Sequence, residues 1–596
     1  MSKRVWKIRS STNSESILGS LFAARGLGTD EDIKNFLDPQ YADHHDPFLM
    51  RDMDRAVARI ERAMKSDEQI TVYADYDADA VTAAAVLLRF FQQLDYKNVD
   101  YYIPDRFTEG YGMNTEAVRI LFDRGSKLII TVDCGINAFE SVLTANELGL
   151  DVIITDHHQL TAGIPAAVAV VNPHRPDDSY PFKHLTGVGV AFKLVQALIK
   201  SPPPLSSPLK PTPKASTLLG DPGKGEEFPS LEGRGSGRVM NGFEKWLLDL
   251  VAIGTIADCQ SLLGENRILV KWGMYVMQKT RWIGLRKLMK MAEIDGQEID
   301  SYKIGFIIAP RINAAGRMEH ADAALKLLLT DDESEAETLA LNLDQLNKHR
   351  QEQTERILSE AREQMILLGD QKILVAAGEG WHKGIVGLVA GKLTEEFYRP
   401  VLVMDKSGQE ATGSARSVGS FNIIEAIGAS HEILVKYGGH PQAAGFTLRT
   451  EHIEIFRKNL LDYAETSLSE DDLSRVLRYD ALVTLSQVTD EFIEFISKFE
   501  PTGIANPRPK FRIDNLTVKK VSAIGKDSTH LRLFVEQNGA ALGCIGFKQG
   551  FWAAKLRAED KIDVICEPQF NEWNGQKNIQ LKIVDLVSSP LQGEVG

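Results

Sequence analysis

The chain has 596 residues, of which 43% are hydrophobic and 25% are charged, an ordinary balance for a protein that folds around apolar cores. At about 150 residues per domain, this length predicts roughly four domains. The 68 basic and 82 acidic residues leave a formal charge of −14, which excludes a uniformly basic coat but not a local basic surface.

The sequence contains no run of about 18 uncharged apolar residues, so we expect no membrane-spanning helix. The basic start at residues 1–7 has no apolar segment behind it, so we expect no secretory signal. None of the four cysteines lies in a CxxC pair. This spacing fits neither a zinc ribbon nor a disulfide framework, and we expect the protein in the reducing cytoplasm.

Residues 1–66 are predicted to form a helical lead-in, because apolar residues between Ala56 and Met64 recur at helical spacing. From 67 to 330, short β-branched runs alternate with amphipathic stretches. The strand-like runs are residues 70–73, 128–132, 152–155 and 168–171, and residues 80–94 have helical spacing. Strands that alternate with helices predict an α/β fold with a doubly wound parallel sheet.

The remaining segments differ in composition. Residues 201–240 are rich in Pro, Gly, Ser and Lys and are predicted to be a disordered insertion. Residues 331–368 are predicted to be one long charged helix, which either links two lobes or lies on the surface. Residues 369–470 resume the strand–helix–strand pattern and predict a smaller α/β domain. After a connector at 471–510, short strands predict a small β-barrel over 511–587, followed by a tail at 588–596.

Four apolar runs end in acidic residues. The acids and the histidines beside them are Asp75, Asp77 and Asp79, then Asp133, then Asp156 with His157 and His158, and finally Asp258. We interpret all four runs as strands, whose carboxyl ends line the ligand crevice of a doubly wound sheet. Any one of these acids alone would be interpreted as a turn or capping residue, so the prediction rests on the joint pattern.

Converged carboxylates repel one another and are costly to desolvate, and no Lys or Arg is interleaved with these acids. Bound cations are the simplest compensation. Carboxylate and imidazole ligands suit Mg²⁺ or Mn²⁺, and two such ions would serve the hydrolysis of a phosphoester. An EF-hand calcium loop is excluded because it needs Gly and Glu where the chain has Ala80 and Val86.

These motifs resemble a known family. Asp75-Tyr-Asp-Ala-Asp, Val132-Asp-Cys-Gly, Asp156-His-His and Ala257-Asp258 resemble the four motifs of the DHH phosphoesterase superfamily. Further motifs resemble its single-strand-specific DNA exonucleases: Arg311-Ile-Asn-Ala-Ala-Gly-Arg-Met, Trp381-His-Lys-Gly, Gly413-Ser-Ala-Arg-Ser and Tyr437-Gly-Gly-His. The resemblance covers nearly the whole chain except 201–240 and the tail. Tyr73 stands where the superfamily often has a histidine.

The resemblance implies a fold and an activity. The fold would be a DHH domain, a long linking helix, a DHH-associated domain and an OB-like barrel. The activity would be a 5′→3′ exonuclease that releases 5′-mononucleotides from single-stranded DNA with two Mn²⁺ or Mg²⁺ ions, in DNA repair and recombination. A helicase and a single-strand-binding protein are the implied partners, without a membrane.

The resemblance also implies roles for particular residues. The expected metal ligands are Asp77, Asp79, Asp133, His157 and Asp258, with Asp133 bridging both ions. Asp75 and Asp156 would ligate or orient ligands, and His158 would contact the scissile phosphate, assist the leaving group or brace a ligand. The expected substrate-binding residues are Arg106, Arg311, Arg317, His382, Ser414, Arg416, Ser417, Gly439 and His440. We expect Gly413–Ser417 to be a flexible loop whose free N–H groups and guanidinium receive the 5′ phosphate.

The C-terminal block differs in charge from the rest of the chain. Residues 501–587 hold 13 basic and 9 acidic residues, a balance of +4. The block also carries seven aromatic residues: Phe511, Phe534, Phe547, Phe551, Trp552, Phe570 and Trp573. A basic surface with exposed rings fits single-stranded DNA, although some of these rings must form the core.

Two alternative functions are a DHH phosphoesterase that acts on short oligonucleotides or small nucleotides, and a non-catalytic DNA-binding scaffold.

Overall fold

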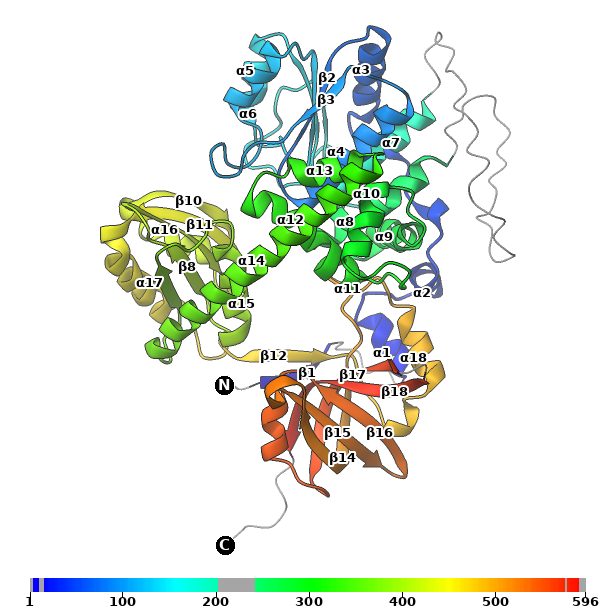
Figure 1. Cartoon of the computed structure of the whole chain (residues 1–596), viewed down its shortest axis with the longest axis vertical. Coiled ribbons are helices and arrows are strands. Elements are labelled where there is room, and N and C mark those ends of the chain that lie inside the picture. Colours follow the sequence, from blue (N-terminus) through cyan, green and yellow to red (C-terminus); the bar gives the residue numbers. More distant parts are fainter. Residues whose placement is uncertain (1–3, 10–15, 202–241, 574–575, 589–596) are drawn as a thin grey trace. The chain divides into compact units, whose positions relative to one another are not determined.

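The computed structural model describes residues 4–9, 16–201, 242–573 and 576–588 (Figure 1). The chain divides into two compact units, Gln40–Asp344 and the combination of Met1–Pro39 with Gln345–Gly596. Apart from Ser201 and Ser588, the predicted insertion at 201–240 and the tail at 588–596 lie outside the described residues. Within the described part of the chain, no helix has the length and apolar character needed to cross a membrane.

The unit Gln40–Asp344 is built on a five-stranded sheet in which every pairing is parallel. The strands, in spatial order, are β3 (Val99–Tyr102), β2 (Ile70–Ala74), β4 (Leu128–Val132), β5 (Asp151–Thr155) and β6 (Ala169–Val171). All residues of β2 and β4 are buried, as expected of strands covered on both faces. The sequence analysis missed β3, whose half-buried Val-Asp-Tyr-Tyr has no long apolar run.

Helices cover both faces of this sheet (Figure 1). On one face, α5 (Thr115–Asp123) and α6 (Phe139–Glu147) share an apolar cluster with β2, β4 and β5. The other face carries α4 (Ala78–Gln93) and α7 (Gly187–Lys200). The chain leaves β2 for β3 on one side and returns to β4 on the other, so the direction of winding reverses between β2 and β4. Ligands bind at such a switch point, and the doubly wound prediction is confirmed.

Further helices of this unit pack on the sheet, on α4 or on one another. They are α3 (Met53–Lys65), α8 (Leu248–Ala257), α9 (Gly264–Met277), α10 (Ile283–Met291), α11 (Ser301–Lys303), η4 (Ile304–Ile308), α12 (Ala309–Met318) and α13 (Asp322–Leu329). One prediction was wrong here, because the fourth apolar run is helix α8 and not a strand. The run is apolar at nearly every position, so it carries no period, and its length of 10 residues is typical of a helix.

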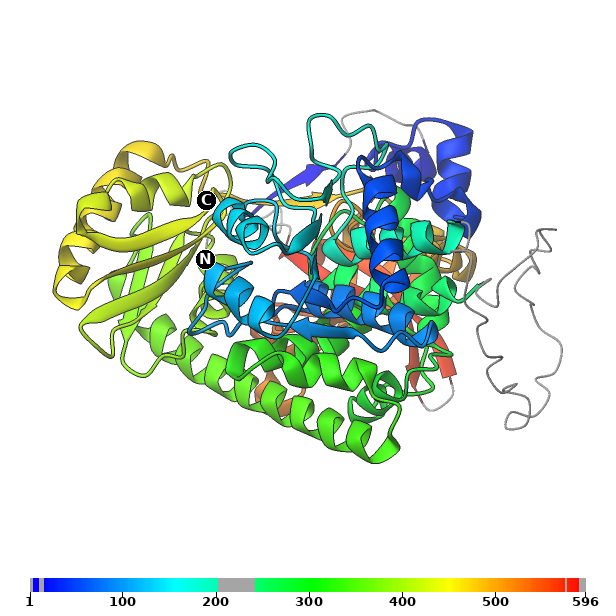
Figure 2. The ribbon, with the colours of Figure 1, turned by 90° about the horizontal axis from the view of Figure 1, so that it is seen from above.

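Helix α14 (Glu333–Leu368) is one uninterrupted helix of 36 residues (Figure 2). The predicted long helix over 331–368 is therefore confirmed. Its first residues belong to the unit just described and its later residues to the other unit.

A second sheet of five strands lies in the other unit. Its spatial order is β10 (Leu434–His440), β11 (Ala443–Arg449), β9 (Glu410–Arg416), β8 (Val401–Asp405) and β7 (Leu374–Gly378). Only β7 and β8 pair in parallel. Helix α15 (Val386–Phe397) packs on β8 and β9, while α16 (Ile423–Gly428) and α17 (Ile453–Ser467) share a core with the sheet.

The predicted loop at Gly413–Ser417 was wrong, because Glu410–Arg416 forms strand β9. The strand pairs with β8 on one side and β11 on the other. Its backbone N–H groups are therefore engaged in the sheet and do not form a free set that could receive a phosphate. Gly413 looks like a loop residue in the sequence, but it makes room for packing inside the sheet. A Cβ at this position would lie 2.4 Å from the ring of Phe446 and 2.8 Å from Met404.

The C-terminal strands close into a barrel, as predicted. Strands β14 (Phe511–Ile524), β15 (His530–Gln537), β16 (Ala540–Gly546), β18 (Gln576–Ser588) and β17 (Lys561–Trp573) are neighbours in that order, and β14 also pairs with β17. Strand β13 (Ala481–Leu482) adds to β14, and helix α18 (Asp490–Ser497) precedes the barrel. Phe511 is buried, whereas Phe534, Phe547 and Phe551 are exposed. The side chain of Trp573 lies outside the described part of the structure.

The lead-in is not helical throughout. Its described part opens with strand β1 (Arg4–Ile8), which pairs in parallel with β12 (Arg475–Tyr479), and only then continues into α1 (Ile17–Ala23) and α2 (Asp30–Leu37). The prediction of helix was wrong for β1 because its partner strand lies 471 residues further along the chain. A five-residue pattern carries no information about such a partner.

Candidate metal centre and substrate-contact residues

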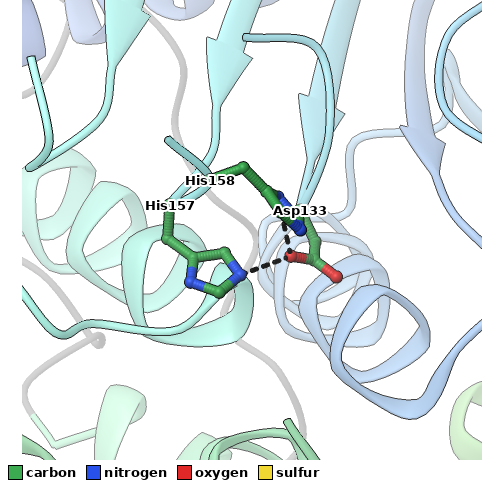
Figure 3. Close-up of side chains that lie close together, drawn as sticks. All are labelled: Asp133, His157 and His158. Carbon is green, nitrogen blue, oxygen red and sulfur yellow. Dashed lines mark ion pairs between the residues drawn. The ribbon is translucent and has the colours of Figure 1, made fainter. Parts of the chain in front are cut away.

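The carboxyl edge of the parallel sheet gathers a buried cluster of acids around one imidazole. The Nε2 atom of His157 lies near three carboxylate oxygens, at 3.1 Å from Asp133, 3.7 Å from Asp258 and 4.0 Å from Asp79. Figure 3 shows Asp133 facing both His157 and His158, whose Nδ1 atom is 3.9 Å away. Asp133 follows β4 with a left-handed backbone, φ 58°, a conformation that is uncommon outside glycine and concentrates at functional sites.

Asp79 is held by the start of helix α7. Its two carboxylate oxygens accept hydrogen bonds from the backbone N–H groups of Gly187 (2.7 Å) and Val188 (2.9 Å). Gly187 also makes room for Asp133, since a Cβ at position 187 would lie 2.3 Å from the Asp133 Cβ. The positive end of a helix stabilises a carboxylate at this place, so α7 both binds one acid and leaves space for another.

Asp77 begins helix α4, and its Oδ1 accepts a hydrogen bond from the N–H of Ala80 at 3.0 Å. The adjacent N–H of Ala78 donates to the side-chain oxygen of Asn313 on helix α12, at 2.9 Å. The segment between the expected ligands Asp77 and Asp79 is therefore fixed from two sides.

Asp156 organises the histidine pair. Its Oδ1 accepts the backbone N–H groups of His157 (2.7 Å) and His158 (3.0 Å) and lies 2.7 Å from the His158 Nδ1. Its Oδ2 accepts the N–H of Ile136 at 2.9 Å. The other ring nitrogen of His158 lies 3.0 Å from the hydroxyl of Tyr111. Because its oxygens are occupied in this way, Asp156 orients the histidines.

Burial and mutual repulsion shift the titration of the cluster. Burial and then neighbouring carboxylates raise the pKa of Asp79 and of Asp133 well above the usual range. The same causes raise the pKa of Asp75 to about 8 and that of Asp258 to about 6. Burial lowers the pKa of His157 to about 4. The acids are therefore poorly compensated by the protein itself.

Several buried polar atoms of the cluster and of the adjacent Asp75 have no hydrogen-bond partner. Among them are Asp75 Oδ2, Asp133 Oδ1, His157 Nε2 and Asp258 Oδ2. Unsatisfied buried polar atoms are rare in native proteins. Two groups of ligand atoms lie close enough to hold an ion, namely Asp133 with His157 and His158, and Asp79 with His157 and Asp258. The residues present therefore fit a divalent cation. The two groups share His157, and the bridging role of Asp133 stays a prediction.

Tyr73 takes no part in either group of ligand atoms. It is buried in the apolar cluster with α5 and α6, stacks on Tyr102 at 5.4 Å and donates its hydroxyl proton to the carbonyl of Gly112 at 3.0 Å. The tyrosine therefore packs in the core, and its replacement of the usual histidine leaves the four acid motifs intact.

Three arginines expected to bind substrate lie in the same unit. The guanidinium of Arg106 lies 4.7 Å from the centre of the Tyr76 ring. Tyr76 stands between Asp75 and Asp77 in the sequence. Arg311 donates to the carboxylate of Asp344 at 3.0 Å and to the carbonyl of Ile307 at 2.7 Å. Arg317 follows Gly316, where a Cβ would lie 2.4 Å from the carbonyl oxygen of Tyr76. Arg311 is thus engaged in an ion pair within the unit, while Arg106 and Arg317 lie beside the first motif.

The remaining expected contacts lie in the other unit. Arg416 donates to the Ser414 hydroxyl at 3.1 Å and to the Ala415 carbonyl at 2.9 Å. Both side chains lie next to Gly387, in the first turn of α15. Burial lowers the pKa of Arg416, and no carboxylate pairs with it within the described residues. Ser417 donates its hydroxyl proton to the carbonyl of Phe421 at 2.6 Å.

The three other residues in this unit have simpler surroundings. The Nδ1 atom of His382 accepts the N–H of Gly384 at 3.1 Å, just before α15. His440 is exposed on the edge strand β10. Gly439 has φ 144°, and a Cβ there would lie 2.4 Å from the Ala443 carbonyl oxygen. Position 439 therefore requires glycine.

The sequence analysis assigned no role to four residues that build the site. They are Gly187 and Val188, which bind Asp79, Tyr111, which contacts His158, and Asn313, which contacts Ala78. Asn313 lies inside the motif at 311–318, and none of the four residues is itself an acid or a histidine. The roles of these residues follow from contacts that only the folded structure shows.

Comparisons with known proteins agree with this geometry. The family model described as "DHH family, N-terminal domain" matches residues 69–218, and the "DHHA1 domain" model matches residues 370–466. Together with the cluster at the switch point of the sheet, these matches define a metal-dependent phosphoesterase of the DHH class. The model described as "RecJ OB domain" matches residues 479–585.

Individual relatives identify the family within this class of phosphoesterases. The single-stranded-DNA-specific exonuclease RecJ of Bacillus subtilis is 40% identical over 97% of this chain and 68% of its own length. The enzyme of the same name from Escherichia coli is 30% identical over 96% of this chain and 95% of its own. The crystal structure of RecJ with Mn²⁺ from Thermus thermophilus superposes with a TM-score of 0.78 at 28% identity, covering 98% of this chain and 80% of that one. The chain belongs to the RecJ family.

Proposed function

We propose that this protein is a metal-dependent exonuclease that removes 5′-mononucleotides from single-stranded DNA in the 5′→3′ direction, in DNA repair and recombination. The observation that carries the proposal is the buried cluster in which Asp133, His157 and Asp258 leave polar atoms unpaired at the switch point of the sheet. The names of the relatives supply the substrate, single-stranded DNA.

Two Mn²⁺ or Mg²⁺ ions would be held by Asp77, Asp79, Asp133, His157 and Asp258. Ions bound there would activate a water molecule for attack on phosphorus and offset the charge that develops on the phosphoryl oxygens. The backbone N–H groups at the start of α7 hold Asp79 in place. Asp75, with one unpaired buried oxygen, either ligates an ion or orients a neighbour.

His158 lies at the same carboxyl edge of the parallel sheet as the proposed metal ligands. Asp156 fixes the ring through Nδ1, so that Nε2 points toward the Tyr111 hydroxyl. We assign His158 to hydrogen-bond the scissile phosphate or to support the leaving oxygen through Nε2. Arg106, whose guanidinium lies over Tyr76, would supply positive charge beside the first acid motif.

The 5′ end would bind in the other unit, at Ser414 and Arg416. A half-buried guanidinium without an acidic partner is costly, and a terminal phosphate would compensate it through charged hydrogen bonds. The first turn of α15 lies against both side chains, and helix N-termini favour anions. Ser417, His382, Gly439 and His440 belong to the same unit and are proposed to line this region, with Arg311 and Arg317 contacting the strand backbone.

The barrel would bind the strand further from the cut. A surface hollow of about 790 Å³ lies on it, lined by Lys520, Arg532, Phe534, Asn571, Asn578 and Gln580 among others. Cations for phosphates, amides for base edges and an exposed ring for stacking are the groups that single strands need. A helicase and a single-strand-binding protein remain the proposed partners. We propose that the enzyme works in the reducing cytoplasm, because none of its four cysteines lies in a CxxC pair.

The test is nuclease activity on one single-stranded DNA labelled at either end, with Mn²⁺ or with EDTA. We expect mononucleotides released from the 5′ end and no product in EDTA, and Asp133→Ala should abolish release. Cleavage of short oligonucleotides alone would favour the small-substrate alternative. Bound but uncut DNA would favour the scaffold alternative.

A further inference from the structure

Helix α12 reaches the first acid motif through one amide side chain. The Oδ1 atom of Asn313 accepts a hydrogen bond from the N–H of Ala78 at 2.9 Å, between residues 235 positions apart in sequence. Ala78 stands between Asp77 and Asp79, both proposed metal ligands, and is the first residue of α4. Asn313 therefore acts on the segment that carries two ligands, without being a ligand itself.

This hydrogen bond satisfies a backbone N–H group at the start of helix α4. The first N–H groups of a helix have no partner within it. The Asp77 side chain serves Ala80, three residues on, and Asn313 serves Ala78. Elsewhere in this site, aspartates turn back to the next residue's N–H, as Asp75 does to Tyr76 at 2.8 Å. Without Asn313 the N–H of Ala78 would lose this acceptor, and the turn that carries Asp77 and Asp79 would be held less firmly.

Helix α12 makes a second contact on the other side of Asp77. Gly316 lies one turn after Asn313, and a Cβ there would be 2.4 Å from the carbonyl oxygen of Tyr76. The helix thus touches the backbone at residues 76 and 78.

We propose that Asn313 is a positioning residue of the metal centre. By accepting the Ala78 N–H it fixes the backbone between Asp77 and Asp79 and so sets where their carboxylates lie. The inference rests on the proposed function, because it requires these two aspartates to be ligands.

The test measures Mn²⁺ binding to the full chain by calorimetry, alongside thermal unfolding in EDTA. Asn313→Ala should weaken Mn²⁺ binding about 10- to 100-fold, the usual cost of losing a group that orients a ligand. The control is Asn146→Ala, which removes a side-chain hydrogen bond of 2.9 Å to the Ala166 carbonyl in the same unit. We expect the control to bind Mn²⁺ like the unmodified chain. The two variants should unfold at similar temperatures in EDTA.

A conservative variant separates positioning from general stability. Asn313→Asp keeps the acceptor oxygen and should retain Mn²⁺ affinity within a few-fold. Asn313→Gln shifts the amide by one methylene and should weaken binding in the same direction as Asn313→Ala, so it serves if the alanine variant does not fold. Binding by Asn313→Ala or Asn313→Gln within twofold of the unmodified chain would overturn the inference, as would an equal loss in Asn313→Asp. Failure of the unmodified chain to bind Mn²⁺ would overturn the proposed function as well.

Discussion

Gly187 offers the sharpest test of the metal centre, because a single methyl group there meets a proposed ligand. In Gly187→Ala the new Cβ would lie 2.3 Å from Cβ and 2.5 Å from Cγ and Oδ1 of Asp133. Non-bonded carbon atoms prefer about 3.5–4.0 Å. Asp133 or helix α7 must therefore move by about 1 Å or more.

The displacement should cost activity more than stability. Overpacking of this kind destabilises by about 1–3 kcal/mol, partly offset by the better helix propensity of alanine, about 1 kcal/mol. A misplacement of about 1 Å in a catalytic constellation can cost about 10²-fold in rate. We expect kcat/KM on 5′-labelled single-stranded DNA to fall by about that factor, with a higher Mn²⁺ requirement and a chain that still folds.

A matched substitution controls for loss of glycine in a helix. Gly391 lies within α15, and a Cβ there would meet nothing within 4 Å. Gly391→Ala should leave nuclease activity unchanged and raise stability slightly. The reasoning fails if Gly187→Ala keeps kcat/KM and the Mn²⁺ requirement within threefold of the unmodified enzyme while Asp133→Ala is inactive.

Three further predictions concern other parts of the chain. Arg416→Ala should lower kcat/KM about 10- to 100-fold on 5′-phosphorylated strands and little on 5′-hydroxyl strands in the same assay; equal losses on both would reject the phosphate contact. In EDTA the melting temperature should fall as pH rises from about 5 to 8, because the folded-state pKa values of Asp258 (about 6) and Asp75 (about 8) exceed their ordinary value, so the folded state loses the protons that favour it. Saturating Mn²⁺ should flatten that slope, and a metal-free melting temperature that rises over this range would contradict the account. Arg25→Ala should destabilise the unit that contains it by about 3–5 kcal/mol in urea unfolding, since Arg25 and its partner Asp480 are fully buried; a loss below about 1 kcal/mol would show that the pair is replaceable.

The Arg25 site joins two segments that lie far apart in the sequence. The guanidinium donates to the side chain of Asn506 at 2.7 Å and to the carbonyl of Pro507 at 2.7 Å, and it lies 4.6 Å from the ring centre of Phe499. These contacts tie the lead-in to the connector before the barrel. The two segments therefore belong to one compact unit, although Arg25 and Asn506 are 481 positions apart in the sequence.

Much of the catalytic edge could be predicted from sequence alone. A buried parallel strand must be a short β-branched run, and its carboxyl end must meet the ends of its neighbours. Acids placed directly after such runs therefore converge whatever the loops do. This is why Asp79, Asp133 and His157 were predicted together, and the structure brings them together.

Other parts required the tertiary structure, because their causes are not local. Helix α8 and strand β9 were misassigned, since an all-apolar run has no period and glycines in a sheet look like glycines in a loop. Strand β1 depends on a partner at Arg475–Tyr479. The bond from Asn313 to Ala78 joins residues 235 positions apart. Sequence determined which acids and histidines gather at the carboxyl edge of the sheet, because residue type and strand period are encoded locally. Tertiary packing decided what holds those residues in place, because a hydrogen-bond donor and its acceptor become neighbours only when the chain folds.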